Sequence, residues 1–218
     1  MQQPHGAGKE TLRASFRVRR RELLAGCGAG LLQHLEVLLA QAGSWPQDGG
    51  APVLATRRGR LGLYWPLAGE PDLRPLLTTS PTWCRHLALP AIAAGRLDYR
   101  PWQPGEALAA DACGIPAPLE RAGRLEPEAL ALLLVPALAI DRQGVRLGYG
   151  GGWYDRLRGQ ECWRRVPALA VLPSGCLCDQ LPRDPWDVPL DGWLTERGLH
   201  WLGKTEPAAP HLDGHDKP

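Results

Sequence analysis

Hydrophobic positions along the chain follow two kinds of spacing, which together predict an alternation of helices and strands. Apolar residues at helical spacing predict helices over residues 9–25 and 29–41, the first with arginines on its outer faces. Two shorter helices are predicted over residues 70–77, where Pro71 suits the first turn, and over residues 154–158. Apolar runs predict strands over residues 60–65, 86–92, 97–102, 132–135, 166–172 and 192–195.

This alternation predicts the fold class and the extent of the domain. Strands that alternate with helices favour an α/β fold, here a three-layer α/β/α sandwich around a largely parallel, Rossmann-like sheet in a single domain. Residues 9–203 form the predicted domain, residues 1–8 a flexible N-terminus and residues 204–218 a disordered polar tail. Residues 43–52 are rich in glycine and proline, which predicts a flexible surface loop.

Composition and charge narrow the function classes. The net charge of the 218 residues is +2, which argues against bulk nucleic-acid binding because that needs a clear basic surplus. The one basic cluster, Arg17, Arg19, Arg20 and Arg21, is most simply a solvated helix face. No stretch approaches 18 consecutive apolar residues, so we expect no membrane span. The six scattered cysteines lack CxxC spacing and no signal peptide is recognised, which predicts reduced thiols in a cytoplasmic protein.

The glycine-rich stretch over residues 146–156 reads Arg-Leu-Gly-Tyr-Gly-Gly-Gly-Trp-Tyr-Asp-Arg. It follows the strongest apolar run, residues 130–140, and a turn at residues 141–144, so it lies at the carboxyl end of a predicted strand, where α/β folds bind ligands. Its backbone N–H groups could converge on phosphate oxygens, with Arg146 supplying charge and Asp155 a carboxylate for magnesium. Glycines alone would equally fit a flexible turn, but the arginines, aromatics and aspartate favour a phosphate site.

A second phosphate-loop pattern, near the C-terminus, is rejected. Residues 198–205 fit the pattern GxxxxGK[ST]. That motif requires a helix directly after its lysine, whereas Pro207 and Pro210 follow here, and the bulky Trp201 would fill the interior of the loop. We therefore expect no Walker-type nucleotide site in this segment.

The segment from residue 134 to residue 156 is similar to the signature of 5-formyltetrahydrofolate cyclo-ligases, also called methenyltetrahydrofolate synthetases. Four shorter elements resemble those of the family in the same order: a Lys-x-x-Leu-Arg element, a strand-Pro-Glu segment, a Gly-Ile-x-x-Pro turn and a C-terminal element, at residues 9–13, 63–72, 114–118 and 181–196. The resemblance spans about residues 9 to 198. The long signature is specific, and the shared order strengthens the short elements.

The resemblance implies an ATP- and magnesium-dependent enzyme that converts 5-formyltetrahydrofolate into 5,10-methenyltetrahydrofolate, ADP and phosphate. It implies catalytic roles for Lys9, Arg146 and Tyr154. The implied ATP-binding set is Lys9, Arg13, Arg146, Leu147, Gly148, Tyr149, Gly150, Gly151, Gly152, Trp153 and Tyr154. The implied folate-binding set is Leu63, Glu70, Tyr149, Gly150, Gly151, Gly152 and Trp153. The implied magnesium ligands are Asp155 and Asp187.

In the implied mechanism, ATP phosphorylates the formyl oxygen and N10 then attacks the activated carbon. This chemistry needs positioning and charge neutralisation rather than a protein nucleophile, which agrees with a site rich in lysine, arginine, glycine and aspartate. The sequence departs from the family at Ala137, Ile140 and Trp153, where glycine, phenylalanine and tyrosine are common. None of these changes removes a charge, so they put only the shape of the pterin pocket in question.

Each site residue also has a plainer interpretation when it is taken alone. Lys9 and Arg13, at i and i+4, could belong to a solvated helix face. Glu70 could be a helix N-terminal acid, and Asp187 a turn residue between two prolines. The shared order of the elements favours the ligand roles.

Three other functions stay open at this point. A non-catalytic folate or nucleotide binder would keep the glycine loop but lack a charged catalytic residue. A nucleic-acid-binding protein would use the arginine-rich helix and the nine tryptophans, against the near-neutral charge. Another ATP-dependent ligase or kinase could share the fold, since a fold alone does not fix a substrate. We expect a reduced folate as the partner, no nucleic acid or membrane, and a monomer.

Overall fold

The longest element is helix α1, Lys9–Gln41, which runs through the predicted break between residues 25 and 29. The structure is a computed structural model that describes residues 8–41, 59–76 and 81–203. The two predicted helices are therefore one, and the predicted break is wrong. Gly30 lies inside this helix, and a Cβ there would come within 2.7 Å of the Glu196 carbonyl oxygen. The glycine lets α1 pack closely on the end of the sheet while the helix continues. The predicted loop at residues 43–52, the predicted disordered tail at 204–218 and the predicted flexible N-terminus at 1–8, apart from residue 8, lie outside the described residues.

A seven-stranded sheet forms the centre of the fold, in the order β12-β11-β9-β6-β1-β2-β3. Pairing is parallel from β11 through β9, β6 and β1 to β2, and antiparallel only at the two edges. This confirms the predicted α/β fold with a largely parallel sheet. The strands span Arg60–Gly62 (β1), Leu87–Ala93 (β2), Arg96–Trp102 (β3), Leu130–Pro136 (β6), Ala168–Val171 (β9), Gly192–Thr195 (β11) and Gly198–Trp201 (β12).

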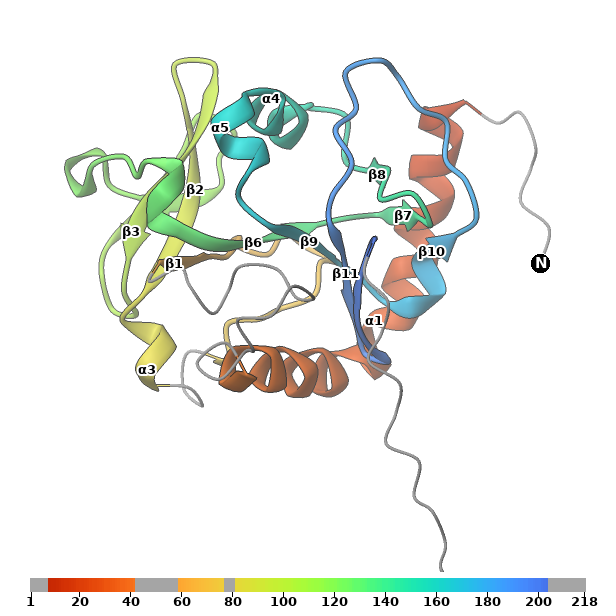
Figure 1. Cartoon of the computed structure of the whole chain (residues 1–218), viewed down its shortest axis with the longest axis horizontal. Helices are drawn as coiled ribbons and strands as arrows, with labels where there is room; N and C mark the ends of the chain where they lie inside the picture. Colours follow the sequence, from red (N-terminus) through yellow and green to blue (C-terminus); the bar gives the residue numbers. More distant parts are fainter. Residues whose placement is uncertain (1–7, 42–58, 77–80, 204–218) are drawn as a thin grey trace, which may run out of the picture.

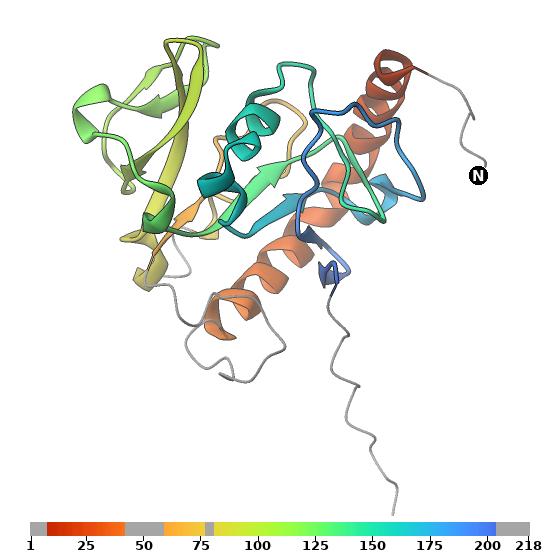
Figure 2. The ribbon, with the colours of Figure 1, turned by 45° about the horizontal axis from the view of Figure 1, so that its top comes forward.

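Two helical layers cover the sheet, as Figures 1 and 2 show: the C-terminal half of α1 on one face, and α4 (Trp153–Gly159) with α5 (Glu161–Arg164) on the other. Every residue of β6 is buried, and from Leu132 to Val135 its side chains alternate between the two cores. Leu133 and Val135 pack on the side of α4, while Leu132 and Leu134 pack with Leu35 of α1. The three layers therefore follow from a strand that is apolar on both faces.

Sequence patterns found every strand of the main sheet except the edge strand β12. Strand β12 was not predicted; it pairs antiparallel with β11 and occupies the start of the rejected phosphate-loop pattern, whose lysine and following residues lie outside the described residues. The predicted helix over residues 70–77 is wrong for residues 70–75. There the Glu70 carboxylate accepts the Leu67 N–H and Asp72 accepts the Arg74 N–H, so turns replace the helix.

Shorter elements complete the described chain. Two ladders flank the main sheet: β4 (Leu108–Ala110) pairs with β5 (Pro116–Pro118), and β7 (Ala139–Asp141) pairs with both β8 (Arg146–Leu147) and β10 (Leu177–Cys178). The remaining helical turns are α3 (Pro81–Cys84), η1 (Glu120–Ala122), η2 (Pro127–Ala129) and η3 (Ser174–Cys176).

Helix α1 passes a length and hydropathy test for a membrane span, which the sequence had not suggested; its most apolar 18-residue window has a mean hydropathy of 1.5. Leu31, Leu35 and Leu38 in this part of the helix are at most 1% exposed against the sheet. We interpret α1 as a core helix on that ground.

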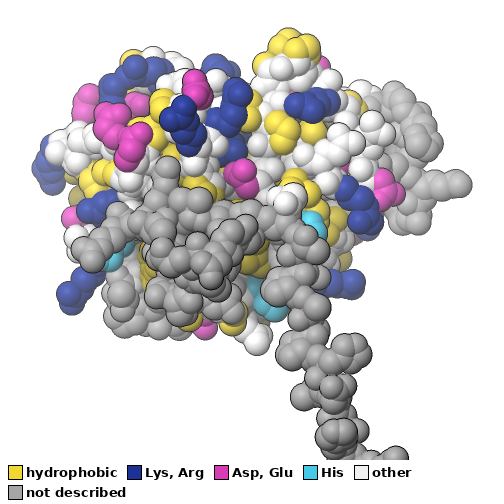
Figure 3. Space-filling view, in the orientation of Figure 1, with side chains coloured by type: hydrophobic (Ala, Val, Ile, Leu, Met, Phe, Trp, Pro, Cys, Tyr) yellow, Lys and Arg dark blue, Asp and Glu magenta, His cyan; other side chains and the backbone are white. Residues whose placement is uncertain are grey.

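On the face shown in Figure 3, basic and acidic side chains are interspersed, as the mixed charge of the sequence predicts.

Asp141 ends β7 and organises the turn that leads into the glycine-rich segment. Its side chain is buried, with 1% exposed. One carboxylate oxygen accepts the N–H groups of Gln143 and Val145, each at 2.9 Å, and the other accepts the N–H of Leu181 at 3.0 Å. The carboxylate thus fixes the β7–β8 hairpin to the segment that follows β10, and so fixes the start of the glycine loop.

We expect Asp141→Ala to lower the free energy of unfolding by about 3 kcal/mol, because three N–H groups, two of them buried, lose their acceptor. Urea denaturation followed by circular dichroism would measure the loss. Asp179→Ala is the matched control: this carboxylate is 87% exposed and, among the described residues, pairs only with Arg142, so its removal should change stability by less than about 0.5 kcal/mol. Equal losses in the two variants would contradict the role given to Asp141.

Candidate active site

A cavity of about 400 Å³ lies beyond the carboxyl ends of β1 and β6. This is the edge of the sheet where the sequence placed the ligand. Its polar lining comes from the N-terminal half of α1, the segment after β1, the glycine loop and residues 184–187. Its more apolar lining comes from the β2–β3 hairpin and the β4–β5 turn: Pro90, Ile92, Leu97, Asp111, Cys113 and Ile115.

Lys9, the first residue of α1, contacts two carboxylates in this cavity. Its Nζ lies 2.7 Å from an oxygen of Asp184 and 2.5 Å from an oxygen of Asp187. Burial acts to lower the pKa of Lys9, but the hydrogen bonds to the two aspartates outweigh it and leave the pKa raised. The Asp187 carboxylate also accepts the Asp184 N–H at 2.7 Å, so the turn is closed around the ammonium group. A ligand phosphate would have to draw Lys9 away from these carboxylates.

Arg13 lies one helical turn after Lys9 and ties α1 to the glycine loop. Its Nε donates to the Gly148 carbonyl at 3.1 Å, and one terminal nitrogen donates to Glu10 at 3.0 Å. Because Lys9 and Arg13 both line the cavity, the i, i+4 pair faces the site rather than forming a wholly solvated helix face.

Arg146 leaves the end of the β7–β8 ladder and lies along the glycine loop. Only 7% of its side chain is exposed, and it pairs with Asp155 at 3.3 Å while its guanidinium lies 5.3 Å from the Tyr154 ring centroid. A Cβ at Gly148 would come within 3.0 Å of the Arg146 Cζ, so a larger residue at this position would displace the guanidinium. Gly152 has φ +63° and immediately precedes α4, which again favours glycine. The loop therefore holds a cation against an exposed stretch of backbone.

Glu70 is the buried acid of the cavity, with 4% of the residue exposed. Its Oε2 accepts the Leu67 N–H at 2.8 Å, whereas among the described residues its Oε1 accepts no hydrogen bond within 3.5 Å and has the Tyr149 hydroxyl near it. Burial raises the pKa of Glu70, while the Leu67 N–H, Arg20, Tyr149 and Arg146 act to lower it. A buried carboxylate oxygen without a protein donor is suited to accept hydrogen bonds from a bound ligand.

Almost all of the predicted site residues meet in this one cavity. Those that line it are Lys9, Arg13, Glu70, Arg146, Leu147, Gly148, Tyr149, Gly150, Gly151, Gly152, Trp153, Tyr154, Asp155 and Asp187. Leu63 is the exception: its side chain is 3% exposed in the core on the α1 side, and its neighbours Tyr64 and Trp65 line the cavity instead.

These positions decide how the comparisons with known proteins apply to the chain. Residues 6–196 match the 5-formyltetrahydrofolate cyclo-ligase family. This chain belongs to that family. A relative of that name from Mycolicibacterium smegmatis is 35% identical over 149 residues, which cover 62% of this chain and 73% of the relative. One from Escherichia coli is 31% identical over 132 residues, 58% of this chain and 72% of the relative.

Structural comparison agrees with the cyclo-ligase assignment. The solved structure of an Aquifex aeolicus 5,10-methenyltetrahydrofolate synthetase superposes with a TM-score of 0.64 and 28% identity, over 95% of this chain and 99% of that one. A synthetase from Mycoplasma pneumoniae has a TM-score of 0.60 at 20% identity, over 87% of this chain and 99% of that one, which supports the fold alone. The protein is accordingly an enzyme of this family, and the sequence recognition is confirmed.

Sequence reasoning about the cyclo-ligase site missed three residues with a clear place in it. Asp184 shares Lys9 with Asp187, and Trp186 lines the cavity although 68% of it is exposed. Arg20 was assigned to a solvated face but is 2% exposed. A signal for Arg20 existed, because positions 9, 13 and 20 fall on one face of a helix with 3.6 residues per turn.

All four tyrosines of the cyclo-ligase have raised pKa values, because burial disfavours the phenolate. The pKa of Tyr154 is raised to about 12 from an ordinary value of 10.0. The folded protein therefore keeps phenol protons that the unfolded chain loses. This stabilisation is fully present below pH 10 and is lost as the pH rises from about 10 through about 12.

We therefore expect little tyrosinate absorbance in the folded protein near pH 10, with Tyr149, the least buried of the four, titrating first. Most tyrosinate should appear together with the loss of the circular dichroism signal. Parallel absorbance and circular dichroism titrations between pH 9 and about 12.5 would test this. Complete tyrosinate formation near pH 10 with native circular dichroism would contradict it.

Proposed function

We propose that this cyclo-ligase converts 5-formyltetrahydrofolate into 5,10-methenyltetrahydrofolate with the hydrolysis of ATP to ADP and phosphate. The observation that supports this most is the joint lining of one cavity. Three cationic side chains, Lys9, Arg13 and Arg146, lie around the glycine loop, and an apolar wall with a buried acid, Glu70, lies in the same cavity. The first group suits a triphosphate, and the second suits a flat heterocycle with amide and amine edges.

Phosphoryl transfer would make the formyl oxygen a good leaving group. In the proposed sequence, the formyl oxygen takes the γ-phosphoryl group and ADP departs. N10 then bonds to the formyl carbon, loses its proton, and the carbon–oxygen bond breaks to release phosphate. Lys9, Arg13 and Arg146 would offset the charge on the transferring group, which is the main protein contribution expected for this chemistry. Tyr154, protonated at neutral pH, would act as a hydrogen-bond donor rather than as a base.

Asp155 and Asp187 are the proposed carboxylates for magnesium. Both line the cavity, and each is now paired with a cation, Arg146 and Lys9 respectively. No group of three or more metal-ligating side chains occurs among the described residues. This fits magnesium better than an all-protein metal site, because magnesium commonly takes one or two carboxylates together with substrate phosphates. Magnesium would supply further charge neutralisation on the phosphates.

The proposed folate contacts use the other part of the cavity. Glu70 offers an acceptor for N–H groups, and Tyr149, Trp153 and the glycine backbone between them line the space beside it. We further propose a cytoplasmic monomer with no nucleic-acid or membrane partner, in keeping with the near-neutral net charge of +2. Light scattering at working concentration would test the monomer.

The direct test is the absorbance of the methenyl product. We expect it to grow with 5-formyltetrahydrofolate, ATP and magnesium together, and to stay flat when any one is omitted. Product formation without ATP, or with ATP but with magnesium chelated, would contradict the proposed dependence. A folded protein that forms no product under any of these conditions would contradict the activity.

Arg146→Ala should reduce kcat by roughly 10²–10³-fold, the loss typical when one preorganised charge donor at a transition state is removed. Arg142→Ala is the matched control, because this arginine precedes it by four residues but is 78% exposed and pairs only with Asp179. The control should keep near-normal turnover. Near-normal turnover in Arg146→Ala itself would remove the catalytic role given to this residue.

A further inference from the structure

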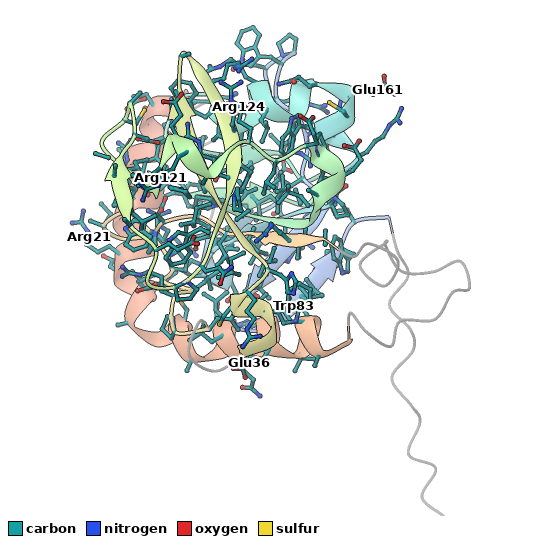
Figure 4. The ribbon with its side chains drawn as sticks, turned by 90° about the vertical axis from the view of Figure 1, so that its left-hand side faces the viewer. Arg21, Glu36, Trp83, Arg121, Arg124 and Glu161 are labelled. Carbon is teal, nitrogen blue, oxygen red and sulfur yellow. The ribbon has the colours of Figure 1, made fainter. Side chains whose placement is uncertain are left out.

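Arg20 differs from the other arginines of its cluster because its side chain turns inward. It is 2% exposed, whereas Arg19 and Arg21 are exposed, and Figure 4 shows Arg21 projecting from α1. One terminal nitrogen of Arg20 donates to the Ala137 carbonyl at 3.0 Å, and the other donates to the Tyr149 hydroxyl. A buried guanidinium is costly unless its neighbours compensate the charge, so its partners are informative.

The compensating group is Glu70. The Tyr149 hydroxyl, which Arg20 holds, lies beside the Glu70 carboxylate, and both Arg20 and Tyr149 act to stabilise that carboxylate in its charged form. Tyr149 and Glu70 line the cavity, but Arg20 does not. Three segments far apart in sequence thus meet in a partly buried series of contacts from α1, through the glycine loop, to the acid at the cavity wall.

We propose that Arg20 is a positioning residue that holds Tyr149 and Glu70 in place for binding of the folate. It acts through these two residues, since it does not reach the cavity itself. The inference rests on the proposed function, in which Glu70 accepts hydrogen bonds from the folate. The Ala137 carbonyl supplies the fixed point: it belongs to the buried segment after β6, so Arg20 anchors the pair to the core rather than to a surface loop.

The charge of Arg20 also bears on the pH range of binding. The charged and titratable side chains around the carboxylate come from α1, β8, the glycine loop, α4 and the segment after β1: Arg20, Arg146, Tyr149, Tyr154 and Tyr64. Burial already raises the pKa of Glu70, and Arg20 opposes that rise. Removing Arg20 should therefore raise the pKa further. Binding that needs the carboxylate would then weaken as the pH falls through this higher value.

The experiment compares Arg20→Met with Arg21→Met, a neighbouring arginine that is exposed. The readout is the Kd of 5-formyltetrahydrofolate without ATP, from quenching of tryptophan fluorescence between pH 5.5 and 8.5, because Trp153 and Trp186 line the cavity. We expect Arg20→Met to raise the Kd roughly 10- to 100-fold, with the acidic limb of the profile at higher pH. The KM for ATP should change by less than about twofold. Arg21→Met should match the wild type in all three.

Two further variants separate positioning from general stability. Arg20→Lys keeps the charge, so its acidic limb should stay near that of the wild type although it cannot make both hydrogen bonds. Tyr149→Phe removes the linking hydroxyl and leaves Arg20 in place, and it should weaken folate binding in the same direction. If Arg20→Met does not fold, as circular dichroism would show, these two variants decide the question: a wild-type Kd in both would overturn the proposal.

A double-mutant cycle gives the sharpest outcome. If Arg20 acts through Glu70, Arg20→Met should add little to the loss caused by Glu70→Gln, so the double variant should bind about as weakly as Glu70→Gln alone. Losses that multiply would show that Arg20 acts independently and would overturn the proposal. Failure of the proposed function looks different: the wild type would bind folate with the expected profile yet form no methenyl product, or would bind no folate at all.

Discussion

Both halves of helix α1 are fixed by contacts with other parts of the chain, and the rest of the site depends on this. The C-terminal half of α1 is buried against the sheet through leucines, while its N-terminal half carries Lys9, Arg13 and Arg20 on a single face. Those three cations contact segments that lie 117 to 178 residues further along the chain. Because the apolar half fixes the direction of the helix, the cations of the other half reach their partners with little further loss of conformational entropy.

Charge pairing in the cavity is the second constraint. Lys9 is matched by two aspartates and Arg146 by Asp155, while Arg20 donates to the Tyr149 hydroxyl near Glu70. Such pairs keep buried charges tolerable before any ligand is bound, since an unpaired charge in the interior would be far more costly. They also mean that a phosphate must exchange partners with the lysine. The fold therefore keeps the cationic side chains close to where a phosphate would bind, and the bound ligand would then neutralise their charge in place of the aspartates.

The β7–β8 hairpin connects the core to this chemistry. Asp141 fixes the turn through three backbone N–H groups, and five residues later Arg146 enters the cavity. The glycine loop then needs little regular structure of its own. Its shape is set by the hairpin before it and by α4 after it, with glycine at the position of positive φ just before the helix. Because the hairpin and α4 hold the two ends of the glycine loop, its backbone N–H groups can be positioned for a phosphate without a long sequence motif.

The sequence by itself determined the layered α/β fold, the central strands and 14 of the 26 residues that line the cavity, but not the apolar wall from the β2–β3 hairpin and the β4–β5 turn. Apolar runs such as β6 are long enough to show burial on both faces, and the glycine-rich signature is local in sequence. It did not determine whether α1 is one helix or two, since packing of Gly30 on the end of the sheet overrides the low helix propensity of glycine. It also misplaced residues 70–75, where side chains bind local N–H groups.

Only the tertiary structure decided which polar residues face inward. Arg20 and Arg21 are adjacent and chemically identical, yet one is buried beside Tyr149 and the other is exposed. Likewise, Leu63 turns into the core while Tyr64 and Trp65 reach the cavity, and Asp184 joins Asp187 through Lys9. Composition and spacing describe a helix face or a turn, but the partner that compensates a buried charge comes from another part of the chain. That partner is known only when the segments have been brought together.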